Sequence, residues 1–140
     1  MSKCINISAR EILKLIELPK DWVCISINEE HEGFYPLGFP EDDRVLRVRF
    51  TDIVGEITYK DKKYNPLSVE NAHKILNFID KNREKHYIVH CQASISRSSA
   101  ICLFLNMIYG HKLKENFWKV SEPNPMVFGR LIIEYKRKLN

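Results

Sequence analysis

Apolar residues follow two different spacings along the chain, one typical of strands and one typical of helices. They run almost without interruption over 22–27, as in a strand covered on both faces. Over 44–50 they alternate with arginine, which predicts a half-exposed strand. A short apolar run at 87–89 predicts a buried strand that leads directly into a polar segment.

Helical spacing appears between these predicted strands. Ser8 and Glu11 have the spacing of a capping box, and the apolar positions after them predict a short amphipathic helix that stops at Pro19. Ser68 is a predicted N-cap for a second helix, in which apolar residues keep a 3.6-residue period to about Lys81.

The second half of the chain is predicted to be mainly helical. Residues 99–109 are apolar nearly all round, as in a helix packed deep against a sheet, and Gly110 is its natural C-cap. Two more helices are expected at about 113–120 and 126–138. The polar stretch 51–66 contains no clear period beyond a possible small hairpin.

Alternating strands and helices predict an α/β fold. We expect a single domain over 1–140, with a central, mostly parallel twisted sheet of four to five strands and helices on both faces. Hydrophobic residues make up 44% of the chain and charged residues 29%, which excludes a disordered or fibrous class.

Charge and cysteine content narrow the class further. A net charge of +4 falls short of the concentrated basic surface of a nucleic-acid binder, and no apolar run is long enough to cross a bilayer. The four cysteines include no CxxC pair, which predicts a reducing, cytoplasmic setting with Cys24 and Cys102 as core residues. The histidines share no ligand spacing, so we expect no metal and no cofactor.

The segment 90–98 carries the candidate chemistry, because it joins a predicted strand to a predicted helix. Five residues separate Cys91 from Arg97. If they form a loop, their amide groups and the positive end of the helix dipole face one point, which creates an anion site and stabilises a thiolate. The planar guanidinium of Arg97 is suited to gripping two phosphate oxygens at once.

Phosphoryl transfer through a cysteinyl-phosphate is the reaction that fits these residues. Cys91 would attack phosphorus, Arg97 would hold the phosphate oxygens, and Ser98 would donate a hydrogen bond to the sulfur. His90 would support the loop. The backbone amides expected to bind phosphate belong to Gln92, Ala93, Ser94, Ile95 and Ser96.

HCQASISRS resembles the HCxxGxxR[ST] signature of the protein-tyrosine phosphatases, and its SRS ending is closest to the small dual-specificity branch. WVCISI, RVLRVRFTD and SEPNPMVFGRLIIEY are similar to other segments of that family, so the resemblance spans Trp22 to Tyr135. It implies a phosphatase of phosphorylated proteins that acts on phosphotyrosine and, through a shallow cleft, on phosphoserine and phosphothreonine.

Ser94 departs from the family pattern, which has glycine at this position. Glycine is favoured where the backbone adopts a positive φ or approaches a ligand closely, so we expect serine to strain or reshape the loop and to reduce or alter activity. Its hydroxyl could also donate a hydrogen bond to the phosphate.

The resemblance further implies a general acid, an aspartate on a loop after an upstream strand. Asp52 directly follows the strand predicted at 44–50 and fits best. Asp61, in the polar stretch, is the alternative.

Two alternatives remain open at this point. The chain could be a phosphate-binding pseudophosphatase or interaction module, as Ser94 and the choice of acid suggest. It could also act on phosphoinositides or RNA 5′-phosphates, because one fold hosts many substrates.

Overall fold

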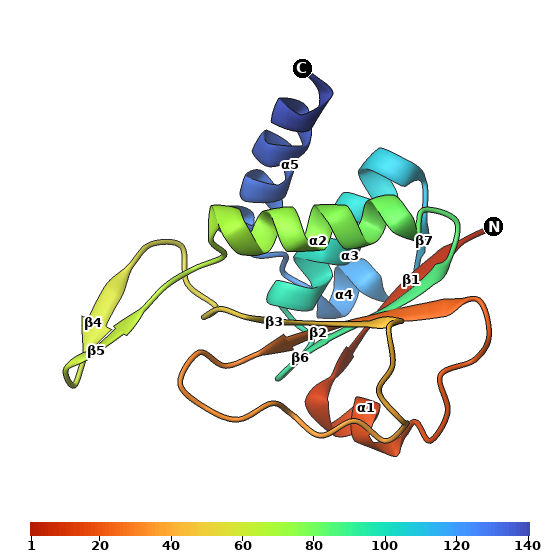
Figure 1. Ribbon diagram of the computed structural model, residues 1–140, viewed down its shortest axis with the longest axis horizontal. Coiled ribbons are helices and arrows are strands. Elements are labelled where there is room, and N and C mark those ends of the chain that lie inside the picture. The colour runs from red at the N-terminus through yellow and green to blue at the C-terminus, as the bar shows by residue number, and fades with distance from the viewer.

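Five parallel strands form the centre of the computed structural model, which describes residues 1–140 (Figure 1). Every neighbouring pair in this sheet runs parallel, which confirms the expected α/β fold. In spatial order the strands are β3 (Val45–Arg49), β2 (Trp22–Asn28), β6 (His86–Cys91), β1 (Lys3–Ser8) and β7 (Lys112–Leu113).

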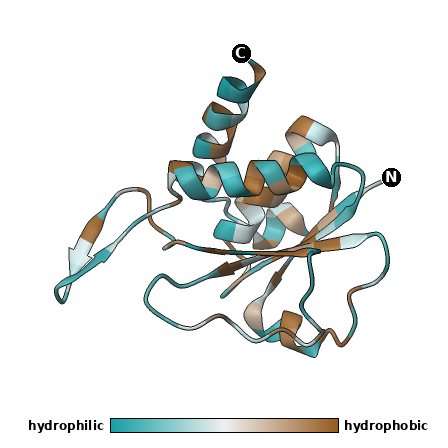
Figure 2. Ribbon diagram, in the orientation of Figure 1, coloured by the Kyte–Doolittle hydropathy of each residue, from teal (hydrophilic) through white to brown (hydrophobic).

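Helices cover both faces of the sheet, as expected, but unequally. The short α1 (Ala9–Lys14) lies on one face, and α2 (Val69–Lys81), α3 (Arg97–Tyr109) and α5 (Pro125–Leu139) lie on the other (Figure 1). The main core of 22 buried residues lies on the side of α2, α3 and α5, whereas the core around α1 has only 5. Figure 2 shows hydrophobic residues along the central strands and a mixture of both kinds around α2.

The first two helices begin where the sequence predicts them. Ser8 and Glu11 form the capping box of α1, and the Ser68 side chain caps α2. However, α1 ends at Lys14 and does not continue toward Pro19. A loop packs against the end of α1, and in this loop the Gly38 N–H donates to the Ile12 carbonyl. A Cβ at Gly38 would lie 2.3 Å from a backbone oxygen of α1, so only glycine permits this close approach.

The boundaries of the later elements agree only in part with those predicted from the sequence. Gly110 caps α3 with a φ of 75°, as predicted. The helix expected over 113–120 is wrong in its first half, because the Lys112 N–H donates to the Ser2 carbonyl and the chain adds β7 to the sheet edge. Only α4 (Phe117–Val120) is helical there.

The polar stretch 51–66 contains the antiparallel hairpin of β4 (Ile57–Tyr59) and β5 (Lys62–Tyr64), which projects away from the main body (Figure 1). No helix in the structure combines the length and the apolar composition required to cross a membrane.

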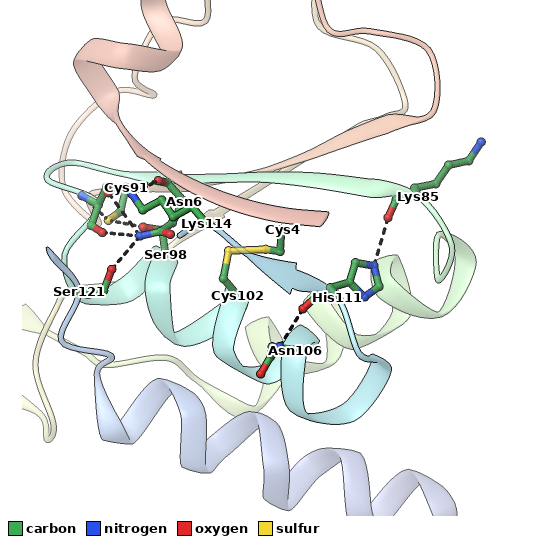
Figure 3. The surroundings of a disulfide bond; sticks show 11 residues. Cys4, Asn6, Lys85, Cys91, Ser98, Cys102, Asn106, His111, Lys114 and Ser121 are labelled. Atoms are coloured by element: carbon green, nitrogen blue, oxygen red, sulfur yellow. Dashed lines mark hydrogen bonds between the residues drawn. A yellow bond between two sulfur atoms is a disulfide. The ribbon is translucent and has the colours of Figure 1, made fainter. Parts of the chain in front are cut away.

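A disulfide joins Cys4 on β1 to Cys102 on α3 (Figure 3). This pairing was not predicted from the sequence, because β1 places Cys4 against a helix that starts far along the chain, although Cys102 does lie in the core as expected. Both residues are fully buried. Cys24 does pack in the core as expected, and burial raises the pKa of its thiol to about 12.

We expect reduction of this disulfide to lower the free energy of unfolding by about 2–4 kcal/mol, because the bond closes a long loop in the unfolded chain. The sequence separation of its cysteines is 98. Urea unfolding with and without reductant measures the loss. A Cys4→Ala/Cys102→Ala variant should not respond to reductant, and detection of four free thiols in the untreated, denatured wild type would contradict the pairing.

Candidate active site

The segment predicted to carry chemistry lies at the carboxyl end of the sheet. Cys91 is the last residue of β6, the central strand, and Arg97 is the first residue of α3. Ser8, the last residue of β1, is the register partner of Cys91. The loop 92–96 therefore connects the middle of the sheet to a helix N-terminus, where ligands bind in open parallel sheets.

Two hydrogen-bonding groups contact the sulfur of Cys91. The Ser94 N–H donates to Sγ at 3.2 Å, and Ser98 Oγ lies 3.2 Å from the same atom. In the thiol form the S–H donates to Ser98 Oγ, and in the thiolate form the Ser98 hydroxyl donates to sulfur. Cys91 is only 3% exposed, so these contacts act in a site with little competing water.

Two protein acceptors hold the guanidinium of Arg97. Nη1 donates to the Phe50 carbonyl at 2.8 Å, and Nη2 donates to Glu29 Oε1 at 2.7 Å. The residue is 4% exposed and its Nε has no partner. A buried guanidinium with an unused donor is a fitting anchor for an oxyanion.

Cys91 and Arg97 share a cavity of about 460 Å³. Its lining residues are Glu29, Thr51, Asp52, Cys91, Gln92, Ala93, Ile95, Ser96, Arg97 and Glu122.

Glu29, Thr51 and Glu122 were not among the residues predicted from the sequence. Glu29 and Thr51 come just after the carboxyl ends of β2 and β3, and that position is a signal that could have found them. Glu122 lies in the loop before α5 and reaches the cavity because its N–H donates to the Ile95 carbonyl. The sequence holds no comparable signal for it.

Ser94 has a φ of 66°, the left-handed conformation in which the glycine of the family pattern would be unstrained. Its side chain is buried against β1, where Ser94 Oγ lies 3.5 Å from the Asn6 carbonyl oxygen. The expected donation to phosphate does not fit this arrangement, because the hydroxyl faces Asn6 and does not line the cavity. Asn6 Nδ2 also donates to the Ser94 carbonyl at 2.8 Å. The same atom donates to Ser121 Oγ at 3.3 Å (Figure 3).

We expect Ser94→Gly to raise the free energy of unfolding by about 1 kcal/mol, because it removes the steric cost of a Cβ at positive φ. Ser96→Gly is the matched control. Ser96 has a φ of −118°, so glycine there should lower stability. Urea unfolding of both variants tests the difference, and a loss of stability in Ser94→Gly as large as that in Ser96→Gly would contradict it.

Asp52 lies in the cavity of Cys91, whereas Asp61 does not. Asp52 Oδ1 accepts from Ser96 Oγ and from Asn124 Nδ2, both at 2.8 Å. Asn124 is in turn fixed as the N-cap of α5, where its Oδ1 accepts from the backbone of the first turn. Asp61 lies in the turn of the β4–β5 hairpin with a φ of 63°. Of the two candidates for the general acid, only Asp52 is placed beside the loop.

His90 is fully buried and does not line the cavity. Its Nε2 lies 2.6 Å from Ser26 Oγ on β2, so the side chain ties the two central strands together. Burial lowers the pKa of His90 to about 4, and the ring is neutral at physiological pH. A supporting position for His90 was expected, and the hydrogen bond that its side chain makes is with Ser26 on β2.

The chain has the fold of the protein-tyrosine phosphatases. One similar solved structure is the human tyrosine phosphatase-like serine/threonine/tyrosine-interacting protein, with a TM-score of 0.52 and 22% identity over 84% of this chain and 78% of that one. Another is Tk-PTP in its active form, with a TM-score of 0.51 and 18% identity over 99% of this chain and 94% of that one. No family model and no curated protein matches the sequence.

Proposed function

We propose that the chain is a phosphomonoester hydrolase that acts through a cysteinyl-phosphate intermediate on phosphoproteins, with phosphotyrosine as the main substrate and phosphoserine or phosphothreonine as further ones. One observation carries the proposal: Cys91, whose buried Sγ contacts Ser94 N–H and Ser98 Oγ, shares a cavity with Arg97, whose Nε has no partner. A nucleophile and an anion anchor are the two parts that this reaction needs.

In the first step the phosphate group lies on Arg97 and the amides of loop 92–96. The thiolate of Cys91 attacks phosphorus, so that the S–P bond forms as the P–O bond to the substrate breaks. Protonated Asp52 gives its proton to the departing oxygen, which leaves as a neutral hydroxyl group. The contacts of Asp52 with Ser96 and Asn124 keep its carboxyl group at the cavity.

In the second step water attacks the cysteinyl-phosphate. Asp52, now a carboxylate, accepts a proton from that water, and the S–P bond breaks to release inorganic phosphate. The Ser98 hydroxyl, 3.2 Å from Sγ, donates a hydrogen bond to the departing thiolate. The site then returns to its starting state.

A second candidate function is phosphate binding without turnover. Ser94 in the loop favours it, and one of the two similar structures is described as phosphatase-like and interacting. In this alternative the cavity would hold a phosphorylated partner, and Asp52 would have no proton to transfer.

A cytoplasmic setting is part of the main proposal, because a cysteine nucleophile must stay reduced to act. The Cys4–Cys102 pair is fully buried and lies out of reach of small thiols in the folded chain.

Hydrolysis of para-nitrophenyl phosphate tests the proposal. The wild type should release para-nitrophenol, and acid-quenched protein should carry one phosphoryl group on the peptide that contains Cys91. Release at the rate of the buffer alone, together with phosphopeptide binding, would replace the main proposal by the second candidate.

A further inference from the structure

Carboxylates outnumber cations around the cavity of Cys91. Glu29, Asp52 and Glu122 line it, whereas Arg97 is the one cation among its lining residues. The excess is local, because the whole chain has a net charge of +4.

A second cavity, of about 290 Å³, extends this acidic surface. It shares Glu29 and Gln92 with the first cavity and continues along the loop after β2. Its other lining residues are Glu30, His31, Glu32, Tyr35, Lys62 and Tyr64. Carboxylates outnumber cations here as well, because Lys62 is its one lysine and it has no arginine.

The carboxylates around the two cavities differ in whether they have hydrogen-bond partners in the protein. Glu29, Glu30 and Asp52 each accept hydrogen bonds from protein side chains. Glu32 and Glu122 are exposed, and their side chains have no hydrogen-bond or ion-pair partner. These two carboxylates are therefore available to interact with substrate groups that lie beside the cavity.

The phosphate group itself has a separate anchor. Arg97 is buried, its Nε is unpartnered, and four residues of the loop 92–96 line the same cavity. The free carboxylates thus act on the groups beside the phosphate. A positive group there is attracted, whereas a second phosphate is repelled.

We propose that Glu32 and Glu122 determine specificity by selecting phosphorylated protein segments with lysine or arginine next to the phosphorylated residue. The same charges disfavour polyanions such as inositol polyphosphates and RNA 5′-triphosphates. The predicted order of hydrolysis rests on the proposed function, whereas the predicted order of binding affinity does not. Each favourable charge pair at this exposed rim should change the specificity constant roughly threefold to tenfold, and added salt should shrink the effect.

Three phosphotyrosine peptides test the inference, identical except that lysine, serine or glutamate occupies the two positions on each side of phosphotyrosine. We expect kcat/KM to fall in the order lysine, serine, glutamate. Glu32→Gln and Glu122→Gln should each lower the ratio of the lysine peptide to the glutamate peptide. Glu17→Gln is the matched control, because Glu17 is exposed and lines neither cavity, and it should leave the ratio unchanged.

Fluorescence anisotropy with the same labelled peptides measures Kd independently of turnover. Equal or reversed affinities would overturn the inference, as would tighter binding of an inositol trisphosphate or a 5′-triphosphorylated RNA. If the lysine peptide binds most tightly but no peptide is hydrolysed, the proposed function alone would be overturned. Hydrolysis of para-nitrophenyl phosphate without a peptide preference would overturn the specificity role alone.

Discussion

Replacing Cys91 by serine should lower the turnover of para-nitrophenyl phosphate by roughly a thousandfold or more, because it removes the nucleophile. A serine hydroxyl is a far weaker nucleophile unless a base takes its proton. The two groups in contact with this atom, the Ser94 N–H and the Ser98 hydroxyl, include no base. Steady-state release of para-nitrophenol measures the loss.

Cys24→Ser is the control for this variant. Cys24 is buried in the small core on the α1 side, and the raised pKa of its thiol keeps it protonated and unreactive. The control should keep its activity once its folding is verified by circular dichroism. Cys91→Ser should still bind a phosphotyrosine peptide through Arg97. Turnover within a few-fold of wild type in Cys91→Ser would contradict the assignment.

Asp52→Asn should lower kcat by about a hundredfold to ten-thousandfold, the usual contribution of a positioned general acid. The substitution keeps an oxygen to accept from Ser96 and Asn124, so the loop contacts are preserved while the transferable proton is lost. The loss should be larger for phenyl phosphate than for para-nitrophenyl phosphate, because phenolate is the poorer leaving group and depends more on the proton.

Asp61→Asn is the matched control, and it should leave kcat unchanged for both substrates. Asp61 lies in the β4–β5 turn, outside the cavity. An equal loss for both leaving groups in Asp52→Asn would show that Asp52 supports the loop without transferring a proton. A loss confined to Asp61→Asn would assign the acid to the hairpin.

Local signals were sufficient to predict several elements of the fold. The bounds of α2 follow from Ser68 and a regular apolar period, and Gly110 ends α3 because the left-handed conformation suits glycine. The loop 92–96 was placed by its position between a buried strand and an apolar helix. Each of these features depends on residues that are close together in the sequence.

Other features depend on residues that are distant in the sequence, and these were missed. β1 is short, and its place beside β6 is decided by tertiary packing. The partner of Cys4 depends on that place, so the disulfide was missed as well. Glu122 reaches the cavity only through a backbone contact to Ile95. Asp52 lies near the loop because the carboxyl ends of parallel strands meet at one edge, and its role as the general acid stays a prediction.

The position of β1 also affects the order in which the protein assembles. Cys4 pairs with Tyr87 on one side and with Leu113 on the other, so β1 is synthesised well before both of its partner strands. Such pairings of high contact order slow folding and leave a strand edge exposed meanwhile. The first residues of the chain are therefore an interior part of the sheet, and an N-terminal deletion that reaches β1 would remove the support of the loop as well as a strand.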